Sequence, residues 1–151
     1  MKWDIRNVRT VLIIDDDPDD YELVYEAMQE VNPGIEVRFV RNCEEALAFK
    51  GKHVDLVLLD INMPYHDGFS WLRSIRKYYR DLPVVMYTNS LSPAHIARAY
   101  DEGANLYFSK PDSFSRLIRA LKALLQMDWS HPSMITEQYK TEGHYKTFQL
   151  Q

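Results

Sequence analysis

The sequence predicts an α/β fold in which a five-stranded parallel sheet is doubly wound, with helices on both faces. Three observations lead to this prediction. Five short runs of consecutive apolar residues recur along the chain, amphipathic stretches fill the intervals between them, and capping residues, proline and glycine mark the boundaries. Short runs that are apolar at consecutive positions are typical of strands covered on both faces, as in a parallel sheet.

The first expected strand, residues 11–14, is a continuous run of β-branched residues and leucine. Similar runs cover residues 37–40, 56–59, 84–87 and 106–108. A helical stretch follows each run, so the chain reads as five β-α units, (βα)5. Right-handed crossovers between successive parallel strands then place helices on both faces of one sheet.

The expected helices show apolar stripes at the spacing of an amphipathic helix. These stripes lie within residues 23–31, 46–49, 69–76, 96–100 and 114–125. Asp17-Pro18 and Ser92-Pro93 each predict a helix start, because a capping side chain precedes a proline at the first helical position. Residues 42–45 resemble a capping box, and Gly103 is placed where the fourth helix should end.

Length, charge and cysteine content exclude several classes of protein. A chain of 151 residues favours one domain with a real core. The net charge of -4 and the pI near 5.7 argue against a nucleic-acid binder, which needs a basic face. No apolar run approaches the length of a membrane span, no signal-peptide pattern is visible, and the single cysteine, Cys43, cannot form an internal disulfide. A cytoplasmic protein that binds no membrane is the expectation.

The pattern changes at Met127 to a polar segment dotted with aromatic residues. We therefore expect a domain over residues 1–126 and a C-terminal tail over residues 127–151. Disordered segments are usually poor in aromatic residues, so we expect this tail to pack on a protein surface. That surface is either the domain's own flank or a second copy of the chain, and our hypothesis is that the tail supports a homodimer.

Polar residues follow the expected strands at the point where each strand ends. Asp15 and Asp16 follow the first strand, Asp60 the third, Thr88 the fourth and Lys110 the fifth. Ligands of such sheets bind at the carboxyl ends of the strands. Three carboxylates that converge there repel one another, and Mg²⁺ relieves that repulsion. A lysine and a hydroxyl beside a carboxylate nucleophile are the groups that a transferred phosphoryl requires.

Four segments in order carry a family resemblance: VLIIDDDPDD, DLVLLDINMPYHDG, PVVMYTNS and GANLYFSKP. Over residues 8–127 the chain resembles the response-regulator receiver domains of two-component signalling, in particular stand-alone, chemotaxis-type receivers. The resemblance implies a flavodoxin-like fold with strand order 2-1-3-4-5. It also implies a phosphoprotein that is no enzyme in its own right. Such a protein takes its phosphoryl group from a histidine kinase or a histidine phosphotransfer protein and signals through contacts with an unknown downstream protein.

The resemblance also assigns a phosphoacceptor and a metal site. Asp60 is implied to form the aspartyl phosphate. Asp16 is implied to bind Mg²⁺ directly. Asp15 is implied either to bind the ion through a water molecule or to contact its ligands without binding the ion itself. Asp60 and the backbone carbonyl of Asn62 are implied to complete the protein's share of the ligands.

Further residues are implied to read the phosphoryl group. Thr88 would bond it through its hydroxyl, and Lys110 would pair with Asp60 or its phosphate. Tyr107 lies at the aromatic position whose rotamer follows phosphorylation, so we expect it to turn inward. Gly68 matches the glycine that closes the acceptor loop, and the Lys110–Pro111 bond is implied to be cis. Asn89 is larger than the small residue often found at its position, which leaves the phosphoryl lifetime open.

Plainer interpretations fit some of the acidic residues better. We expect Asp17 to cap a helix rather than to bind metal, and Asp19 and Asp20 to be solvated surface residues.

Two other functions stay open from the sequence. Asp15 with Asp17 fits the acidic pair of a haloacid-dehalogenase-type phosphatase, although Pro18 stands where Thr or Val is usual and the late acidic pair is missing. A pseudo-receiver that binds partners without phosphorylation is the third hypothesis. It is disfavoured because such proteins typically lose an acidic or lysine position, and here none is lost.

Overall fold

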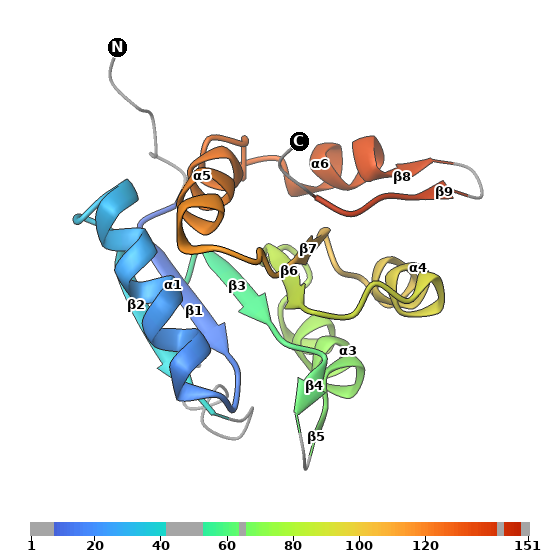
Figure 1. The fold of residues 1–151 in the computed structure, drawn as a ribbon. Helices are drawn as coiled ribbons and strands as arrows, with labels where there is room; N and C mark the ends of the chain where they lie inside the picture. The colour runs from blue at the N-terminus through green and yellow to red at the C-terminus, as the bar shows by residue number, and fades with distance from the viewer. Residues whose placement is uncertain (1–7, 42–52, 64–65, 142–143, 149–151) are drawn as a thin grey trace.

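A computed structural model describes residues 8–41, 53–63, 66–141 and 144–148 (Figure 1). Its centre is a five-stranded parallel sheet. The strands are β1 (Thr10–Ile14), β2 (Glu36–Val40), β3 (Leu56–Leu59), β6 (Val84–Thr88) and β7 (Leu106–Ser109). They lie in the order β2-β1-β3-β6-β7, which is the order 2-1-3-4-5 of the expected strands. The predicted fold class and topology are confirmed.

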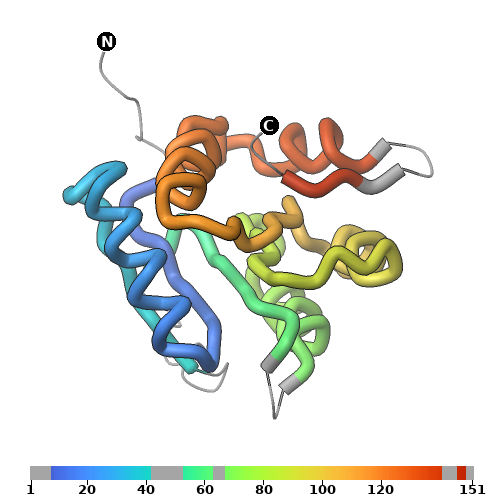
Figure 2. Tube along the Cα trace, viewed as in Figure 1, coloured from blue at the N-terminus to red at the C-terminus, as the bar shows by residue number. Residues whose placement is uncertain are grey.

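Helices cover both faces of this sheet (Figures 1 and 2). They are α1 (Pro18–Val31), α3 (Gly68–Tyr78), α4 (Pro93–Asp101), α5 (Phe114–Leu125) and α6 (Pro132–Tyr139). Two short antiparallel hairpins accompany them: β4 (Asn62–Met63) with β5 (His66–Asp67), and β8 (Lys140–Thr141) with β9 (His144–Tyr145). The helix expected near residues 46–49 and its capping box at 42–45 lie outside the described residues.

The strands supply two separate apolar cores because successive side chains point to opposite faces of a sheet. Val11 and Ile13 join the core formed with α1 and α5, whereas Leu12 and Ile14 join the core formed with α3 and α4. Burial on both faces explains why the strands read as continuous apolar runs. β2 departs from this pattern, since most of its residues are only partly buried at the edge of the sheet.

The predicted helix starts are confirmed by their capping bonds. The Asp17 side chain accepts a hydrogen bond from the Asp19 amide at the start of α1, and Ser92 accepts one from the His95 amide at the start of α4. Gly103 ends the turn after α4 with φ +110°, a backbone conformation that glycine adopts without strain. Two residues of the predicted stripes are misplaced, because Leu23 on α1 and Phe114 at the start of α5 are exposed.

The segment after α5 packs on its own domain, on the side of α5 and β7 (Figure 1). Trp129 is buried, and its indole N–H donates to the Leu124 carbonyl oxygen at 2.8 Å. Phe148 forms a parallel bridge with Phe108 of β7, and its ring packs edge-on against Phe108. Tyr139, at the end of α6, packs against both apolar cores. These contacts place Trp129, Tyr139 and Phe148 of the tail against the domain.

No helix within the described ranges combines the length and the apolar character that crossing a membrane requires.

The first prediction is that Trp129→Ala lowers the free energy of unfolding by about 3–5 kcal/mol, as truncation of a large buried aromatic side chain usually does. Urea denaturation followed by circular dichroism measures the change. Met134→Ala is the matched control, since Met134 lies in the same segment but is 60% exposed. Equal stabilities of the two variants would contradict the packing of the tail.

Candidate functional site

The site lies at the carboxyl ends of β1 and β3, which are neighbours in the sheet. Ile14 pairs with Leu59, so the residues that follow, Asp15 and Asp60, come side by side. Each amide continues the strand ladder: the Asp15 amide donates to the Val40 carbonyl oxygen at 3.1 Å, and the Asp60 amide donates to that of Ile14 at 3.0 Å. Both carboxyl groups are buried. The sheet therefore fixes two acidic side chains in a site that is shielded from water.

Asp16 completes a group of three carboxylates. One oxygen of each of Asp15, Asp16 and Asp60 lies within 4.8 Å of the others. Asp16 is partly buried, so it borders the opening of the group. Carboxylate oxygens at this separation fit a divalent cation that takes a few protein ligands and keeps several waters.

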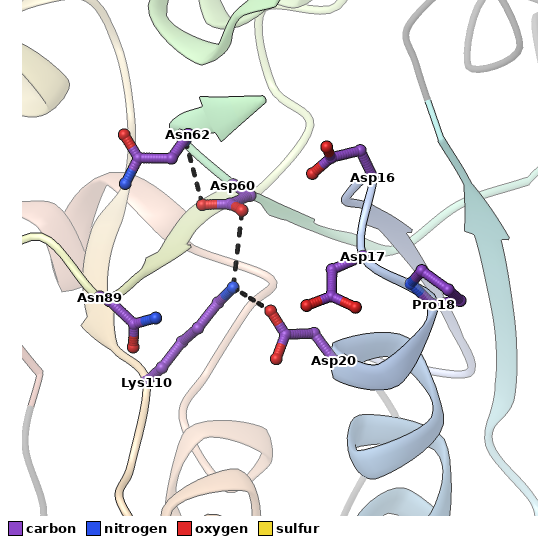
Figure 3. Close-up of a pocket in the computed structure, with 8 residues that line it drawn as sticks. All are labelled: Asp16, Asp17, Pro18, Asp20, Asp60, Asn62, Asn89 and Lys110. Atoms are coloured by element: carbon purple, nitrogen blue, oxygen red, sulfur yellow. Dashed lines mark hydrogen bonds and ion pairs between the residues drawn. The ribbon is translucent and has the colours of Figure 1, made fainter. Parts of the chain in front are cut away.

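Lys110 extends into the same site from the end of β7 (Figure 3). Its ammonium nitrogen lies 3.2 Å from Asp15 Oδ2 and 3.5 Å from Asp60 Oδ2, and it lies closest to Asp20 Oδ2, at 2.5 Å. One buried cation is thus shared by three carboxylates. The prediction that Asp20 is a solvated surface residue is wrong, because α1 directs its side chain toward Lys110.

Burial dominates the electrostatics of the two strand-end carboxyls. Desolvation raises the pKa of Asp15 to about 6, against the opposing effects of the Asp17 amide hydrogen bond and the Lys110 charge. Desolvation also raises the pKa of Asp60, and Lys110 and the Asn62 amide oppose that rise. Burial alone would lower the pKa of Lys110, but the hydrogen bond to Asp20 and the surrounding carboxylates outweigh it and raise that pKa. The site therefore stabilises the protonated, positively charged form of Lys110.

A pocket of about 440 Å³ opens over these groups, enough for a metal ion together with a phosphoryl group (Figure 3). Its lining residues are Asp16, Asp17, Pro18, Asp20, Asp60, Asn62, Asn89 and Lys110. Of the residues predicted for the site, Asp16, Asp60, Asn62 and Lys110 line the pocket, and Asp15 contacts Lys110. Thr88 is fully buried, and it is its neighbour Asn89 that lines the pocket.

Asp60 sits in a loop that only a glycine closes. The Asn62 amide donates to Asp60 Oδ1 at 3.2 Å, and the Gly68 amide donates to the Ile61 carbonyl oxygen at 3.2 Å. A Cβ atom on Gly68 would collide with the Asp60 carbonyl oxygen and would lie 2.6 Å from Ile61 Cα. Gly68 therefore lets the start of α3 approach the backbone that carries Asp60.

The expected switch residue, Tyr107, is fully buried in β7. Its hydroxyl donates to the Ser90 carbonyl oxygen at 2.6 Å, and the Ser90 amide donates to Thr88 Oγ1 at 3.3 Å. Ser90 therefore links Tyr107 to Thr88. Tyr107 already points inward in this structure, so its expected turn on phosphorylation stays a prediction.

The tail reaches Tyr107 through the backbone. The Phe148 amide donates to the Tyr107 carbonyl oxygen at 2.7 Å. The Tyr107 amide donates to the Tyr100 hydroxyl at 3.1 Å, and that hydroxyl donates to the Lys146 carbonyl oxygen at 2.6 Å. Both polar backbone groups of Tyr107 are therefore connected to the tail.

Asp17 caps α1, as predicted, and among the described residues Lys110 forms its ion pairs with Asp15, Asp20 and Asp60 instead. The expected cis bond at Lys110–Pro111 is wrong, since the bond is trans. Trans is the more stable isomer of an X–Pro bond by about 0.5–1 kcal/mol.

Asp20 is the pocket residue whose place the sequence analysis missed. The sequence carried no signal that separates Asp20 from Asp19, because both lie in the first turn of α1. Only the packing of that helix decides which of them faces Lys110.

The chain is similar to known proteins of one family. The family model for the response regulator receiver domain matches residues 11–122. The transcriptional regulatory protein GltR of Pseudomonas aeruginosa is 34% identical over 123 residues, which are 80% of this chain and 50% of that protein. CpxR of Klebsiella pneumoniae is 31% identical over 84% of this chain and 54% of that protein. This chain thus spans about half the length of these curated relatives.

Two solved structures show the same arrangement. The phosphorylated cyanobacterial phytochrome response regulator RcpA superposes with a TM-score of 0.70 at 28% identity, over 78% of this chain and 91% of that one. The chemotaxis response regulator CheY4 of Vibrio cholerae superposes with a TM-score of 0.66 at 28% identity, over 78% and 98% of the two chains.

The second prediction follows from the raised pKa of Asp15. In the unfolded chain this carboxyl has its ordinary pKa of 3.8, and in the folded protein it has a pKa of about 6. The folded state therefore binds more protons between these values, and the stability of the metal-free protein falls as the pH rises through that window. The difference corresponds to a loss on the order of 3 kcal/mol.

Urea denaturation in EDTA at pH 4.5 and at pH 7 measures this loss. Asp15→Asn should remove much of it, whereas Asp19→Asn, at an exposed position of α1, should preserve it. An unchanged pH dependence in Asp15→Asn would show that another group is responsible.

Proposed function

The chain belongs to the response regulator receiver family of two-component signal transduction, and we propose that it accepts a phosphoryl group on Asp60. The observation that supports this most strongly is the environment of Asp60. It is a buried carboxylate at a strand end, with Lys110 Nζ 3.5 Å away and two further carboxylates beside it. The donor in this proposal is a phosphohistidine of a histidine kinase or a histidine phosphotransfer protein.

Phosphoryl transfer to Asp60 requires a nucleophile, a group that stabilises negative charge and a leaving group. A carboxylate oxygen of Asp60 attacks phosphorus, the P–N bond to the donor's imidazole breaks, and the imidazole nitrogen leaves and takes up a proton. The product is an acyl phosphate on Asp60. Lys110 is placed to donate to a phosphoryl oxygen, and its positive charge offsets the negative charge that gathers there. The main-chain amide of Asn62, which donates to Asp60, holds the nucleophile in place.

A divalent cation fits the acidic residues of this site. Asp15, Asp16 and Asp60 offer three oxygens within 4.8 Å, and the raised pKa values of Asp15 and Asp60 reflect buried negative charge that a cation would relieve. In the proposal Asp16 and Asp60 hold Mg²⁺ with the Asn62 backbone carbonyl, and Asp15 supports them. When bound, Mg²⁺ supplies positive charge that stabilises the phosphoryl oxygens.

The output that we propose passes through Thr88 and Tyr107. Ser90 connects their side chains, and the tail is hydrogen-bonded to both backbone groups of Tyr107 through Phe148 and Tyr100. A phosphoryl group that bonds the Thr88 hydroxyl would therefore act on Ser90, then on Tyr107, then on the tail. In this proposal the downstream protein recognises the surface of α4, β7 and the tail.

A homodimer remains part of the proposal. Met134 on α6 is exposed and gives the tail an apolar contact point for a second copy. Light scattering over a range of protein concentrations measures the mass, and a monomer at all concentrations would exclude the dimer.

The third prediction is that acetyl phosphate with Mg²⁺ adds one phosphoryl group to the protein and that Asp60→Asn abolishes this addition, because an amide is no phosphoryl acceptor. Intact-mass spectrometry measures both. Asp112→Asn is the matched control: this carboxylate lies near Lys110 in sequence but is exposed. Labelling of Asp60→Asn to the wild-type extent would rule out Asp60. Repeated turnover of an aryl phosphate would instead support a phosphatase.

The fourth prediction concerns the path to the tail. Beryllofluoride, which imitates a phosphoryl group on Asp60, should change the amide NMR signals of Ser90, Tyr107 and Phe148 as well as those around Asp60. Phe148→Ala should weaken the change at Lys146 while leaving that at Ser90. Changes confined to residues 60–68 would mean that the tail is not coupled to the site.

A further inference from the structure

Asp20 lies closer to Lys110 than either of the strand-end carboxylates does. The Lys110 nitrogen is 2.5 Å from Asp20, 3.2 Å from Asp15 and 3.5 Å from Asp60. Figure 3 shows the Asp20 side chain leaving the first turn of α1 and pointing across the pocket to the lysine, whose other drawn contact is Asp60. The cation that should neutralise a phosphoryl group on Asp60 is thus bound most closely by a carboxylate of α1.

We infer that Asp20 is a positioning residue that holds Lys110 away from Asp60 and so sets how readily the site takes up a phosphoryl group. This inference rests on the proposed function, because it concerns the same acceptor. Asp20 acts through Lys110 and through its own charge, and it takes no part in bond making.

The ammonium group of Lys110 has no N–H donor to spare in this arrangement. An ammonium group has three N–H donors, and three carboxylates already accept from Lys110. A phosphoryl group on Asp60 takes the place of the longest of these contacts, at 3.5 Å, and Lys110 can bond its oxygen fully only by moving away from Asp15 or Asp20.

Burial decides which contact is given up. The Asp15 side chain is 1% exposed, so an Asp15 carboxylate without Lys110 would be a buried charge with less compensation. The Asp20 side chain is 29% exposed, and water can solvate its carboxylate when Lys110 leaves. The contact with Asp20 is therefore the cheapest to break, and its strength sets the cost of moving Lys110.

The charge of Asp20 acts in the same direction. Asp20 lines the pocket together with Asp16, Asp17 and Asp60. An anionic phosphodonor that enters this pocket meets the negative charge of Asp20 in addition to that of the metal-site carboxylates. Removal of this charge therefore favours entry of the phosphodonor. It also favours movement of Lys110 toward a phosphoryl group on Asp60.

Stabilisation of the helix is the competing explanation for an acid at this position. Acidic residues in the first turn of a helix interact favourably with its dipole, and both Asp19 and Asp20 lie in the first turn of α1. They differ in surroundings, because Asp19 is exposed and Asp20 contacts Lys110. A helix role predicts the same effect for both residues, whereas positioning of Lys110 predicts an effect for Asp20 alone.

The fifth prediction uses this pair of neighbours on the full chain. With Mg²⁺ present, Asp20→Asn should lower the half-saturating concentrations of beryllofluoride and of acetyl phosphate roughly two- to fivefold, the effect expected from loss of a partly exposed ion pair. Asp19→Asn, which removes the same charge one residue away, should leave both concentrations unchanged. Asp20→Glu should restore values near those of the wild type. Intrinsic fluorescence and intact-mass spectrometry measure the two titrations.

A double variant tests whether the effect passes through the lysine. In a Lys110→Met background, Asp20→Asn should lower the beryllofluoride concentration by a smaller factor than in the wild type, with only the effect of pocket charge remaining. Unchanged or higher concentrations in Asp20→Asn, an equal decrease in Asp19→Asn, or an undiminished decrease in the Lys110→Met background would each overturn the inference.

A measurement without metal or phosphodonor separates this inference from the proposed function. The NMR signals of the Lys110 side chain next to its ammonium group should shift in Asp20→Asn and remain in place in Asp19→Asn. If acetyl phosphate fails to label wild-type Asp60, the proposed function fails. If labelling succeeds but the Lys110 signals are the same in all three proteins, the inference about Asp20 fails by itself.

Discussion

The arrangement of the site depends on one constraint, which is that a single lysine must compensate several carboxylates in a place with little water. Buried negative charge is costly unless it is paired. The sheet fixes Asp15 and Asp60 at adjacent strand ends, and β7 brings Lys110 to both of them. The raised pKa values of the two acids show that this compensation is incomplete. The remaining negative charge is what makes the site suited to a divalent cation.

The sequence was sufficient to predict the sheet, since the strands other than β2 are buried on both faces and contain few polar residues that would interrupt the apolar runs. Alternation of Leu12 and Ile13 between the two cores is the structural counterpart of that pattern. The caps Asp17 and Ser92 were predictable because a capping bond depends on residues close in sequence. The path of the tail was not, because Trp129 and Phe148 are placed by packing against distant parts of the chain.

The same distinction between near and distant partners applies to the site. Asp15, Asp16, Asp60 and Lys110 could be placed from the sequence because each lies within two residues of the end of a parallel strand. Asp20 could not be distinguished from Asp19 by residue type, since only the direction of α1 relative to β7 decides which of the two faces the lysine. The cis isomer of the Lys110–Pro111 bond was implied by the family resemblance alone, whereas the ordinary preference of X–Pro bonds favours the trans isomer that the structure has.

Tyr139 joins two parts of the protein that the sheet otherwise separates. Its side chain packs against the core on the α1 and α5 face and against the core on the α3 and α4 face. Neither core can lose its order without also loosening the ring that the other core contacts. The tail therefore acts as a thermodynamic link around the β7 edge of the sheet, and it favours unfolding of the two layers in one cooperative transition rather than in sequence.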